Sequence, residues 1–339
     1  MISPLADGHR QHGVPLLVFQ EAQWPVQFRE PIEEYRAVQE RVGLFDASAL
    51  GLLELTGRDR ATFLHGLVTN DLKHLPLHHA CWACTLTPTG KVTAVCLVAH
   101  RDDAHWLIIP RWLRSRVRTF FEQYLIMEDV QIADRSEEWT LLALQGPQAA
   151  QLAPTIHAMT LATIPHDPLG VPGVLCVVRN DAAVAVWERC QQQGAQPVGL
   201  TAFQMLRLEA GLPWYGVDVD ETCLLPETGW ERTATSYTKG CYIGQEIVAR
   251  VASQGRVARH LVGLKLSSPQ PPTTPCEILC DGQPCGTLTS AASSPRYEAV
   301  LGLGMLSRKA WETHAPLVVS GQQPLAAELV PLPQLPLPA

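Results

Sequence analysis

Apolar residues recur along much of this chain at helical spacing. Residues 31–44 carry four of them on one helical stripe, namely Ile32, Tyr35, Val38 and Val42. The same pattern predicts further helices over residues 58–72, 111–126, 181–194 and 200–211, and another that starts near Pro147.

Short apolar runs bounded by turn residues lie between the predicted helices. They predict strands over residues 50–57, 82–88, 92–100, 105–110, 137–146 and 171–180. Thr89 and Gly90 separate two of these runs and favour a β-hairpin. Mixed helices and strands of this kind indicate α+β domains, each with an antiparallel sheet.

The pattern changes after about residue 255. Short apolar stretches punctuated by glycine and proline predict a small antiparallel β-barrel over residues 255–339. Four prolines follow Val330, so we expect this Pro-rich tail to be extended or frayed.

Composition limits the class of protein. The chain has 339 residues, of which 46% are apolar and 17% charged, so it can build packed cores. Its net charge of −7 argues against a protein that mainly coats nucleic acid. No run of about 18 apolar residues predicts a membrane-spanning helix. The first residues do not resemble a signal peptide, so we expect a cytoplasmic protein whose ten cysteines are reduced thiols.

The stretch TKGCYIGQE, residues 238–246, holds the first candidate for chemistry. A nearby cation or a helix N-terminus lowers the pKa of a thiol, and Cys241 has Lys239 two residues before it and a predicted helix after it. Gly240 and Gly244 allow main-chain N–H groups to approach a ligand. The alternative is a structural turn with an incidental cysteine.

A second candidate lies at the end of the helix predicted over residues 200–211. Glu209 is flanked by apolar residues, and Trp214 follows shortly after. A carboxylate beside aromatic rings suits a flat heterocycle, because it accepts N–H bonds while the rings stack. The alternative is an ordinary helix end with a surface charge.

The cysteine clusters do not predict a metal site. Cys81 and Cys84 form a single C-x-x-C motif, preceded by His78 and His79, whereas a closed zinc site needs four ligands. On a strand the two thiols point to opposite faces. The three cysteines of residues 276–285 would not converge easily either, so we expect no permanently bound metal.

Two arginine-rich stretches leave a nucleic-acid interaction open. Residues 111–118 hold four arginines, and residues 250–259 hold Arg250, Arg256 and Arg259. Such charges on a helix usually form a solvated face. A weak RNA contact through these stretches remains an alternative function.

The motifs together resemble a known superfamily. Residues 41–72, LALQGP at 142–147 and RLEAGLPWYGVDVDE at 207–221 are similar, in the same order, to the folate-dependent aminomethyltransferases, the T-proteins of the glycine cleavage system. KGCYIGQE resembles the signature of one branch, the YgfZ proteins, which are folate-binding factors for iron–sulfur protein maturation and tRNA modification. The T-protein has a different sequence at that place.

This resemblance implies a fold and a ligand. It implies a T-protein-like ring of three domains, with two interleaved α+β domains in residues 1–254, the second including roughly residues 46–135, followed by the barrel. It also implies tetrahydrofolate or a one-carbon derivative as the ligand, and catalytic roles for Cys241 and Lys239. The implied cofactor-binding residues are Asn70, Glu209, Trp214, Tyr242 and Gln245.

One departure from the T-protein pattern bears on activity. Thr93 and Ala94 stand where that enzyme has acidic residues, and neither can exchange a proton near neutral pH. We therefore expect no aminomethyl transfer of the T-protein type.

The first hypothesis is that the protein is a folate-binding factor for the assembly or repair of iron–sulfur clusters in client enzymes, including tRNA-modifying ones, with client or scaffold proteins as partners. The alternative is a folate-dependent one-carbon transferase or demethylase with Cys241 as nucleophile.

Overall fold

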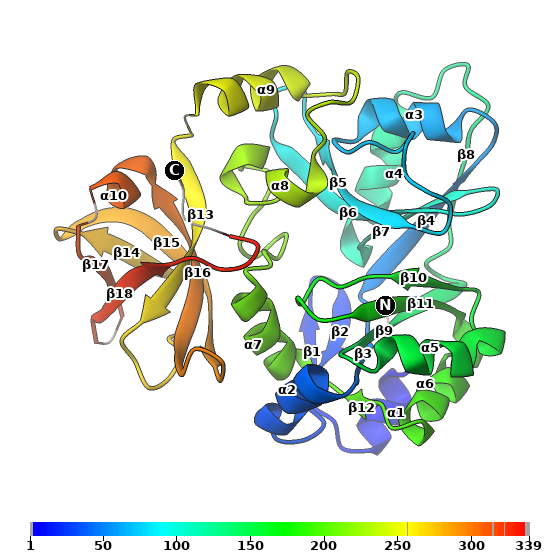
Figure 1. Ribbon diagram of the computed structural model, residues 1–339, viewed down its shortest axis with the longest axis horizontal. Helices are drawn as coiled ribbons and strands as arrows, with labels where there is room; N and C mark the ends of the chain where they lie inside the picture. Colours follow the sequence, from blue (N-terminus) through cyan, green and yellow to red (C-terminus); the bar gives the residue numbers. More distant parts are fainter. Residues whose placement is uncertain (1–2, 256, 314, 322, 336–339) are drawn as a thin grey trace. The chain divides into compact units, whose positions relative to one another are not determined.

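The computed structural model describes residues 3–255, 257–313, 315–321 and 323–335 (Figure 1). These residues form two compact units, each made of several chain segments. Unit 1 contains the described residues up to Thr85 together with Ala94–Phe203 and Ala234–Tyr242. Unit 2 contains Leu86–Thr93, Gln204–Thr233 and the described residues from Ile243 onward.

The N-terminal part of unit 1 holds elements that the apolar pattern does not predict. They are α1 (Ala6–Gln11) and a hairpin of β1 (Leu16–Phe19) and β2 (Ala22–Pro25). The helix predicted over residues 31–44 is present as α2 (Pro31–Glu40). It is shorter than predicted, because the residues from Gly43 onward already belong to a strand.

The first sheet of unit 1 has the strand order β10-β11-β9-β3-β12. Its strands are β3 (Gly43–Asp46), β9 (Trp139–Gln145), β10 (Ala162–Pro165), β11 (Gly173–Arg179) and β12 (Gln196–Pro197). All pairs are antiparallel except β12 with β3. Helices α5 (Ala149–Ile156) and α6 (Ala183–Gln192) pack on one face of this sheet (Figure 1).

The second sheet of unit 1 has the order β5-β6-β7-β4-β8. Its strands are β4 (Leu50–Thr56), β5 (Ala80–Leu86), β6 (Val92–His100), β7 (His105–Pro110) and β8 (Gln131–Asp134). The predicted hairpin around Gly90 is therefore present, and Gly90 has the positive φ of 78° that its turn requires. Helices α3 (Arg60–Leu67) and α4 (Arg114–Glu122) connect strands of this sheet.

Strand β9 lies at the centre of the packing of unit 1. Leu142 and Leu144 belong to the cluster formed with α5 and α6. Leu141 and Ala143 instead join the cluster that contains Leu52 of the second sheet. Because successive side chains of a strand point to opposite faces, one strand serves both cores. This explains why residues 139–145 read as a nearly continuous apolar run.

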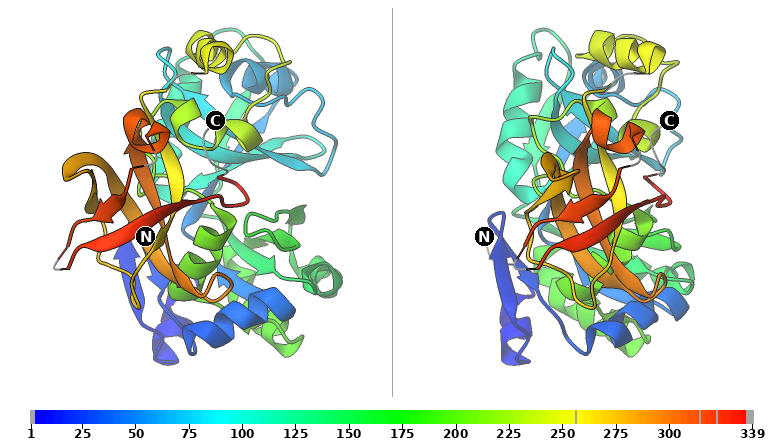
Figure 2. Two further views of the ribbon diagram at one scale, coloured as in Figure 1. Left: turned by 60° about the vertical axis from the view of Figure 1, so that its left-hand side comes forward. Right: turned by 90° about the vertical axis from the view of Figure 1, so that its left-hand side faces the viewer.

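Unit 2 is built on a closed barrel of strands in the order β13-β16-β15-β14-β17-β18 (Figure 2). The strands are β13 (Arg259–Leu266), β14 (Cys276–Cys280), β15 (Gln283–Ser294), β16 (Ala299–Ser307), β17 (Leu317–Val319) and β18 (Leu325–Val330). The remaining helices are α7 (Leu200–Ala210), α8 (Glu231–Ala234), α9 (Gln245–Gln254) and α10 (Arg308–Glu312). The predicted fold class, α+β with a C-terminal antiparallel barrel, is confirmed.

The prediction for the tail is wrong for the residues that the structure describes. Leu332 and Leu335 are buried and form an isolated β-bridge with each other. The backbone N–H of Gln334 donates to the carbonyl of Ala210 at the end of α7. Pro331 and Pro333 do not prevent this, because proline residues interrupt a ladder without removing neighbouring apolar side chains from the core. The prolines at 336 and 338 lie outside the described residues.

Within the described residues, no helix combines the length and apolarity that a membrane crossing requires. The ring arrangement and the domain boundary near residue 255 stay predictions.

One buried histidine in unit 1 affects the pH dependence of stability. His105, at the start of β7, is 1% exposed, and its ring stacks on that of His100 at 4.6 Å between centroids. Among the described residues, neither ring nitrogen of His105 has a hydrogen-bond partner. Burial lowers the pKa of His105 to about 4, and the charges of His100 and Arg60 act in the same direction.

We expect this histidine to weaken the fold in acid. The unfolded chain takes up the proton near pH 6.5 and the folded chain only near pH 4, so stability falls as the pH falls through this window. Between pH 7.5 and pH 5, His105→Phe should lose about 2 kcal/mol less unfolding free energy than the wild type, as measured by urea denaturation. His157→Gln, at an exposed position, is the control. Equal losses in wild type and His105→Phe would contradict this.

Candidate functional site

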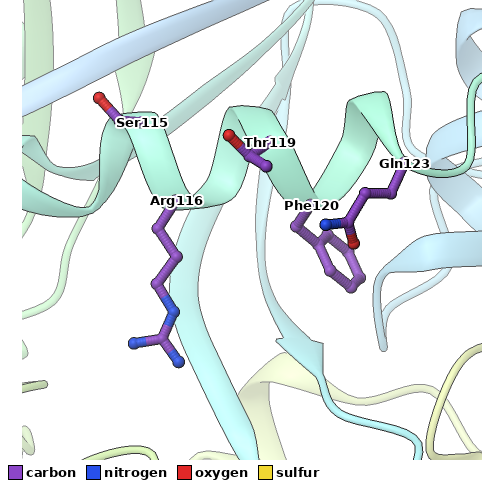
Figure 3. Close-up of a pocket in the computed structure, with 5 residues that line it drawn as sticks. All are labelled: Ser115, Arg116, Thr119, Phe120 and Gln123. Carbon is purple, nitrogen blue, oxygen red and sulfur yellow. The ribbon is translucent and has the colours of Figure 1, made fainter.

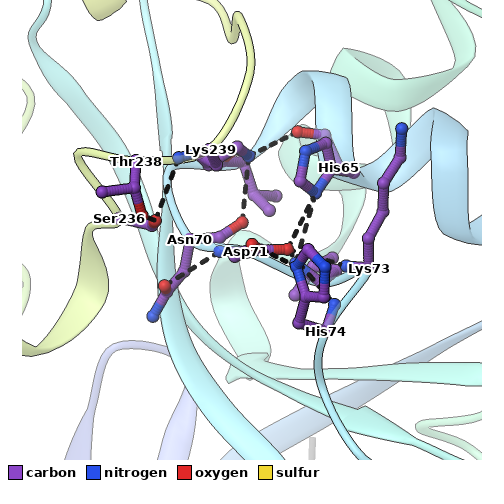
Figure 4. Close-up of polar contacts among 10 residues, drawn as sticks. His65, Asn70, Asp71, Lys73, His74, Ser236, Thr238 and Lys239 are labelled. Carbon is purple, nitrogen blue, oxygen red and sulfur yellow. Dashed lines mark hydrogen bonds and ion pairs between the residues drawn. The ribbon is translucent and has the colours of Figure 1, made fainter.

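The loop that carries Cys241 is anchored by a buried lysine. The ammonium of Lys239 donates to the carbonyls of His65, Val68 and Asn70 at 2.5, 2.6 and 2.9 Å (Figure 4). These carbonyls lie at and just beyond the C-terminal end of α3. The last carbonyls of a helix lack intrahelical partners and carry partial negative charge, so a cation there is stabilised.

The anchoring gives Lys239 a structural role that the sequence analysis does not predict. An ammonium has three N–H donors, and these three carbonyls can take all of them. The lysine therefore ties the loop to α3. Its expected effect on the thiol of Cys241 stays a prediction. Burial lowers the pKa of Lys239 to about 8, with Asp71 opposing the shift.

Further contacts hold the same loop in unit 1. The Thr69 hydroxyl donates to the carbonyl of Ala234 at 2.5 Å, and the Ser236 N–H donates to the carbonyl of Thr69 at 3.1 Å. The Lys239 N–H donates to the hydroxyl of Ser236 at 3.2 Å. Within this supported loop, Cys241 is exposed to solvent. A fixed backbone with an accessible thiol suits a residue that reacts with a ligand.

The two other predicted residues of unit 1 adjoin this anchor. The Tyr242 ring lies 5.1 Å from the Lys239 ammonium, within the range of a cation–π contact, and burial raises the pKa of its phenol to about 12. The Asn70 side chain donates to the carbonyl of Trp82 at 2.7 Å, which ties it to β5. The structure thus brings Asn70, Lys239 and Tyr242 together.

An acid–imidazole cluster, which the sequence analysis does not identify, lies beside the anchor. Asp71 is 2.7 Å from the Nδ1 of His74 and 3.5 Å from the Nδ1 of His65 (Figure 4). Burial lowers the pKa of His65, and Lys239 adds to this, whereas Asp71 opposes it. His65 and Asp71 are six residues apart in the sequence, and this spacing forms no motif by which the pair could be recognised. Among the described residues, no group of three or more histidine, cysteine or acidic side chains has the arrangement of a metal site.

Unit 2 holds Glu209, the predicted carboxylate. Glu209 is 3% exposed near the end of α7, which closes at Gly211 with a φ of 71°. Its Oε1 accepts from the Ser294 hydroxyl at 2.5 Å and from the Arg296 N–H at 3.1 Å. Both donors belong to the end of β15 and the turn after it, so the barrel orients this carboxylate.

A buried ion pair supports the same helix. Arg207 and Asp218, with side chains 1% and 0% exposed, are 2.7 Å apart. Ser290 donates to Asp218 at 2.5 Å and accepts from Arg207 at 2.6 Å. The Trp214 N–H also donates to Asp218, at 2.9 Å, and the Arg207 guanidinium lies 5.6 Å from the Trp214 ring. The sequence analysis does not identify this network. Arg207, a charged residue within the apolar stretch 200–211, is the sequence signal for a buried ion pair.

Gln245, the last predicted cofactor-binding residue, begins α9 and is half-buried. Gly244 before it has a φ of 81°, and a Cβ there would lie 2.6 Å from the carbonyl oxygen of Thr87. Thr93 is half-buried and Ala94 fully buried, and the carbonyl of Thr93 accepts from the Tyr215 hydroxyl at 3.0 Å. The residues predicted as one site therefore belong to two units, each of which is described by itself.

The arginines proposed to contact RNA are mostly engaged elsewhere. Arg111 is buried and donates to the carbonyls of Ser48 and Ser136, and Arg114 pairs with Asp134 at 3.1 Å. Arg259 pairs with Glu227 at 3.1 Å, and position 256 lies outside the described residues.

A pocket of about 400 Å³ runs along one face of α4, lined by Ser115, Arg116, Thr119, Phe120 and Gln123 (Figure 3).

Two domain families match the chain. Residues 5–167 match the GCVT N-terminal domain, and residues 259–335 match the glycine cleavage T-protein C-terminal barrel domain. The second match coincides with the barrel of unit 2. The two domains occur in the order expected for a T-protein.

Similar proteins align over nearly the whole chain. An aminomethyltransferase of Rubrobacter xylanophilus is 29% identical over 98% of this chain and 93% of its own length. An aminomethyltransferase of Thermoanaerobacter pseudethanolicus is 28% identical over 91% and 89%. The crystal structure of the glycine cleavage system aminomethyltransferase T from Bartonella henselae matches with a TM-score of 0.88 at 20% identity, over 99% of this chain and 98% of that one. The last match shows the same fold.

The chain thus has the domains and the fold of the aminomethyltransferase, or T-protein, superfamily.

We expect Lys239→Met to loosen this loop. The variant removes three N–H···O bonds to the end of α3, so amide hydrogen exchange in residues 234–242 should become faster, with α3 affected at its C-terminal end. Lys73→Met, at an exposed position, is the control and should leave exchange unchanged. Unchanged exchange in Lys239→Met, measured by mass spectrometry, would show that the anchor is dispensable.

Proposed function

We propose that the protein binds a reduced folate, tetrahydrofolate or a one-carbon derivative, and acts as a folate-dependent one-carbon transferase or demethylase. The observation that carries this proposal is the superfamily match over both domains, with relatives that are aminomethyltransferases along nearly their full length. Tetrahydrofolate is the carrier on which that superfamily acts.

Glu209 is the proposed anchor for the pterin. A reduced pterin carries N–H groups that a carboxylate accepts well, and a hydrogen bond to a charged group contributes more than one between neutral groups. The bonds from Ser294 and Arg296 fix the orientation of this carboxylate before any ligand arrives. Trp214 and Gln245, in the same unit, are the proposed neighbours of the ligand.

Cys241 is the proposed nucleophile. Its thiolate attacks the electrophilic carbon of a donor, so that an S–C bond forms while the bond from that carbon to the leaving atom breaks, and the leaving atom takes a proton. A folate nitrogen then attacks the same carbon, the S–C bond breaks, and the nitrogen loses its proton. An exposed thiol on a rigidly held loop suits both steps. Thr93 and Ala94 cannot supply the carboxylate that the T-protein uses, so the thiol takes a covalent role instead.

A second candidate function is support of iron–sulfur cluster assembly or repair in client enzymes, including tRNA-modifying ones. The specific observation that favours it is the loop KGCYIGQE, in which an exposed thiol is held on a lysine anchor while the acidic position is occupied by Thr93. In this candidate, the cluster or a sulfur species is the cargo of Cys241, and the folate is a regulatory or stabilising ligand.

Titration with tetrahydrofolate tests the shared folate site. We expect Glu209→Gln to weaken binding about 10- to 100-fold, because it removes a charge-assisted hydrogen bond. Cys241→Ser should bind as the wild type does. Glu188→Gln, at an exposed position, is the control for charge. Ser294→Ala, which keeps the carboxylate but frees one of its bonds, should weaken binding less than Glu209→Gln. Unchanged binding by Glu209→Gln would mean that the folate site lies elsewhere.

Turnover distinguishes the two candidate functions. With tetrahydrofolate and a panel of N-methyl and S-aminomethyl donors, the transferase should form a folate that carries a one-carbon unit, and Cys241→Ser should form none. Chromatography of the folates gives the measurement. Normal folate binding without any turnover would favour the second candidate, for which cells depleted of the protein should lose activity in several iron–sulfur enzymes.

A further inference from the structure

The barrel contains a tight hairpin with a cysteine on each strand. Strands β14 and β15 are joined by Asp281 and Gly282, whose φ values of 51° and 76° match a two-residue turn with both central residues left-handed. Such a turn fixes the register, and Cys280 pairs with Gln283 directly across it. The hairpin lies within unit 2.

A β-bulge redirects the second cysteine. The pairing shifts from Leu279 with Pro284 to Ile278 with Gly286, so Cys285 is the extra residue on β15. A bulge turns a side chain away from its regular direction. Here Cys285 stands two positions along β15 from Gln283, the cross-strand partner of Cys280, and the side chains of both cysteines pack at the edge of the apolar cluster inside the barrel.

The neighbouring cysteine differs in its contacts. Cys276 lies on the same strand as Cys280, but its thiol donates to the carbonyl of Thr273 at 2.6 Å. The register places it opposite Leu288, well away from the turn. The structure therefore provides one pair of adjacent thiols and, on the same hairpin, a thiol with another partner.

We propose that Cys280 and Cys285 are a redox modification site, which closes reversibly to a disulfide across the β14–β15 hairpin. With glutathione disulfide as oxidant, one protein thiolate attacks a glutathione sulfur, forming a mixed disulfide and releasing glutathione. The second protein thiol loses its proton and attacks the mixed disulfide, which forms the protein disulfide and releases a second glutathione. Two protein thiols are oxidised and one glutathione disulfide is reduced.

The geometry favours the second step over the addition of another glutathione. Two thiols at neighbouring positions of one hairpin present an attacking sulfur at a high effective concentration, so ring closure competes well with the bimolecular reaction. Both side chains are half-buried rather than fully buried, which leaves them reachable by a small oxidant. Burial raises the pKa of Cys285 to about 11, so the reaction should accelerate as the pH rises from 7 to 9.

The test uses the full-length protein in glutathione redox buffers at pH 8. After acid quenching and alkylation, intact mass and peptide mass spectrometry report the disulfide and the glutathione adducts. We expect an internal Cys280–Cys285 disulfide in the wild type as the glutathione disulfide fraction rises. Cys280→Ser and Cys285→Ser should each carry one glutathione at the remaining member of the pair.

Two matched variants serve as controls. Cys276→Ser removes the third thiol of the hairpin and should form the disulfide as the wild type does. Cys241→Ser should do so too, because the pair is independent of the proposed folate chemistry. If the Cys276→Ser protein remains reduced in oxidising buffer, or carries glutathione on both Cys280 and Cys285, the proposal is wrong. Since the single variants could also lower stability, their melting temperatures are compared in reducing buffer.

Discussion

The buried ion pair between Arg207 and Asp218 is the constraint on which unit 2 depends. Each charge would be costly away from water, and a buried pair is tolerated only when the remaining donors and acceptors are also satisfied. Gln204, Leu212, Ser290 and Thr289 do this here. As a result, α7 and β15 can adopt only one register, because a shift of either element would leave a charge unpaired. Glu209 follows two residues after Arg207 on the same helix and takes its own bond from β15, so the ion pair also determines where this carboxylate points.

Unit 1 also contains a buried cation, but its partners are of a different kind. Its buried cation, Lys239, has carbonyls as partners instead of a carboxylate, at the end of α3 where such groups need donors. A neutral partner holds the ammonium less tightly than a carboxylate would, which agrees with the lowered pKa of Lys239. The protein thus uses one buried cation to orient a carboxylate and another to hold the loop of an exposed thiol. Both candidate functional groups are positioned through polar contacts remote in sequence.

The sequence predicts the features that depend on residues close to one another along the chain. Most helices and strands from residue 31 to residue 211 follow from apolar periodicity, and the hairpin at Gly90 follows from its turn residues. The short strands β3, β8, β10 and β12 are not predicted, because they have too few residues to show a period. Glu209 and Cys241 are recognisable because each stands in a short distinctive stretch. The partners of Lys239 could not be predicted, because they lie more than 160 residues away and are backbone carbonyls, which leave no trace in the side-chain pattern. The burial of Leu332 and Leu335 was missed for a related reason: proline-rich composition predicts the local conformation but not the surface against which a segment packs.

Closure of the barrel has a consequence for how the chain folds. Strand β13 pairs on one side with β18, across some 60 residues of intervening chain, and the segment after β18 then covers the end of α7. During synthesis β13 emerges long before its partner, so for that interval an edge with unpaired N–H and C=O groups is open to other strands. Lys265 is exposed and lies in the stretch of β13 that pairs with β18, so it places a charge on this edge, which discourages pairing with foreign strands while the proper partner is still being made.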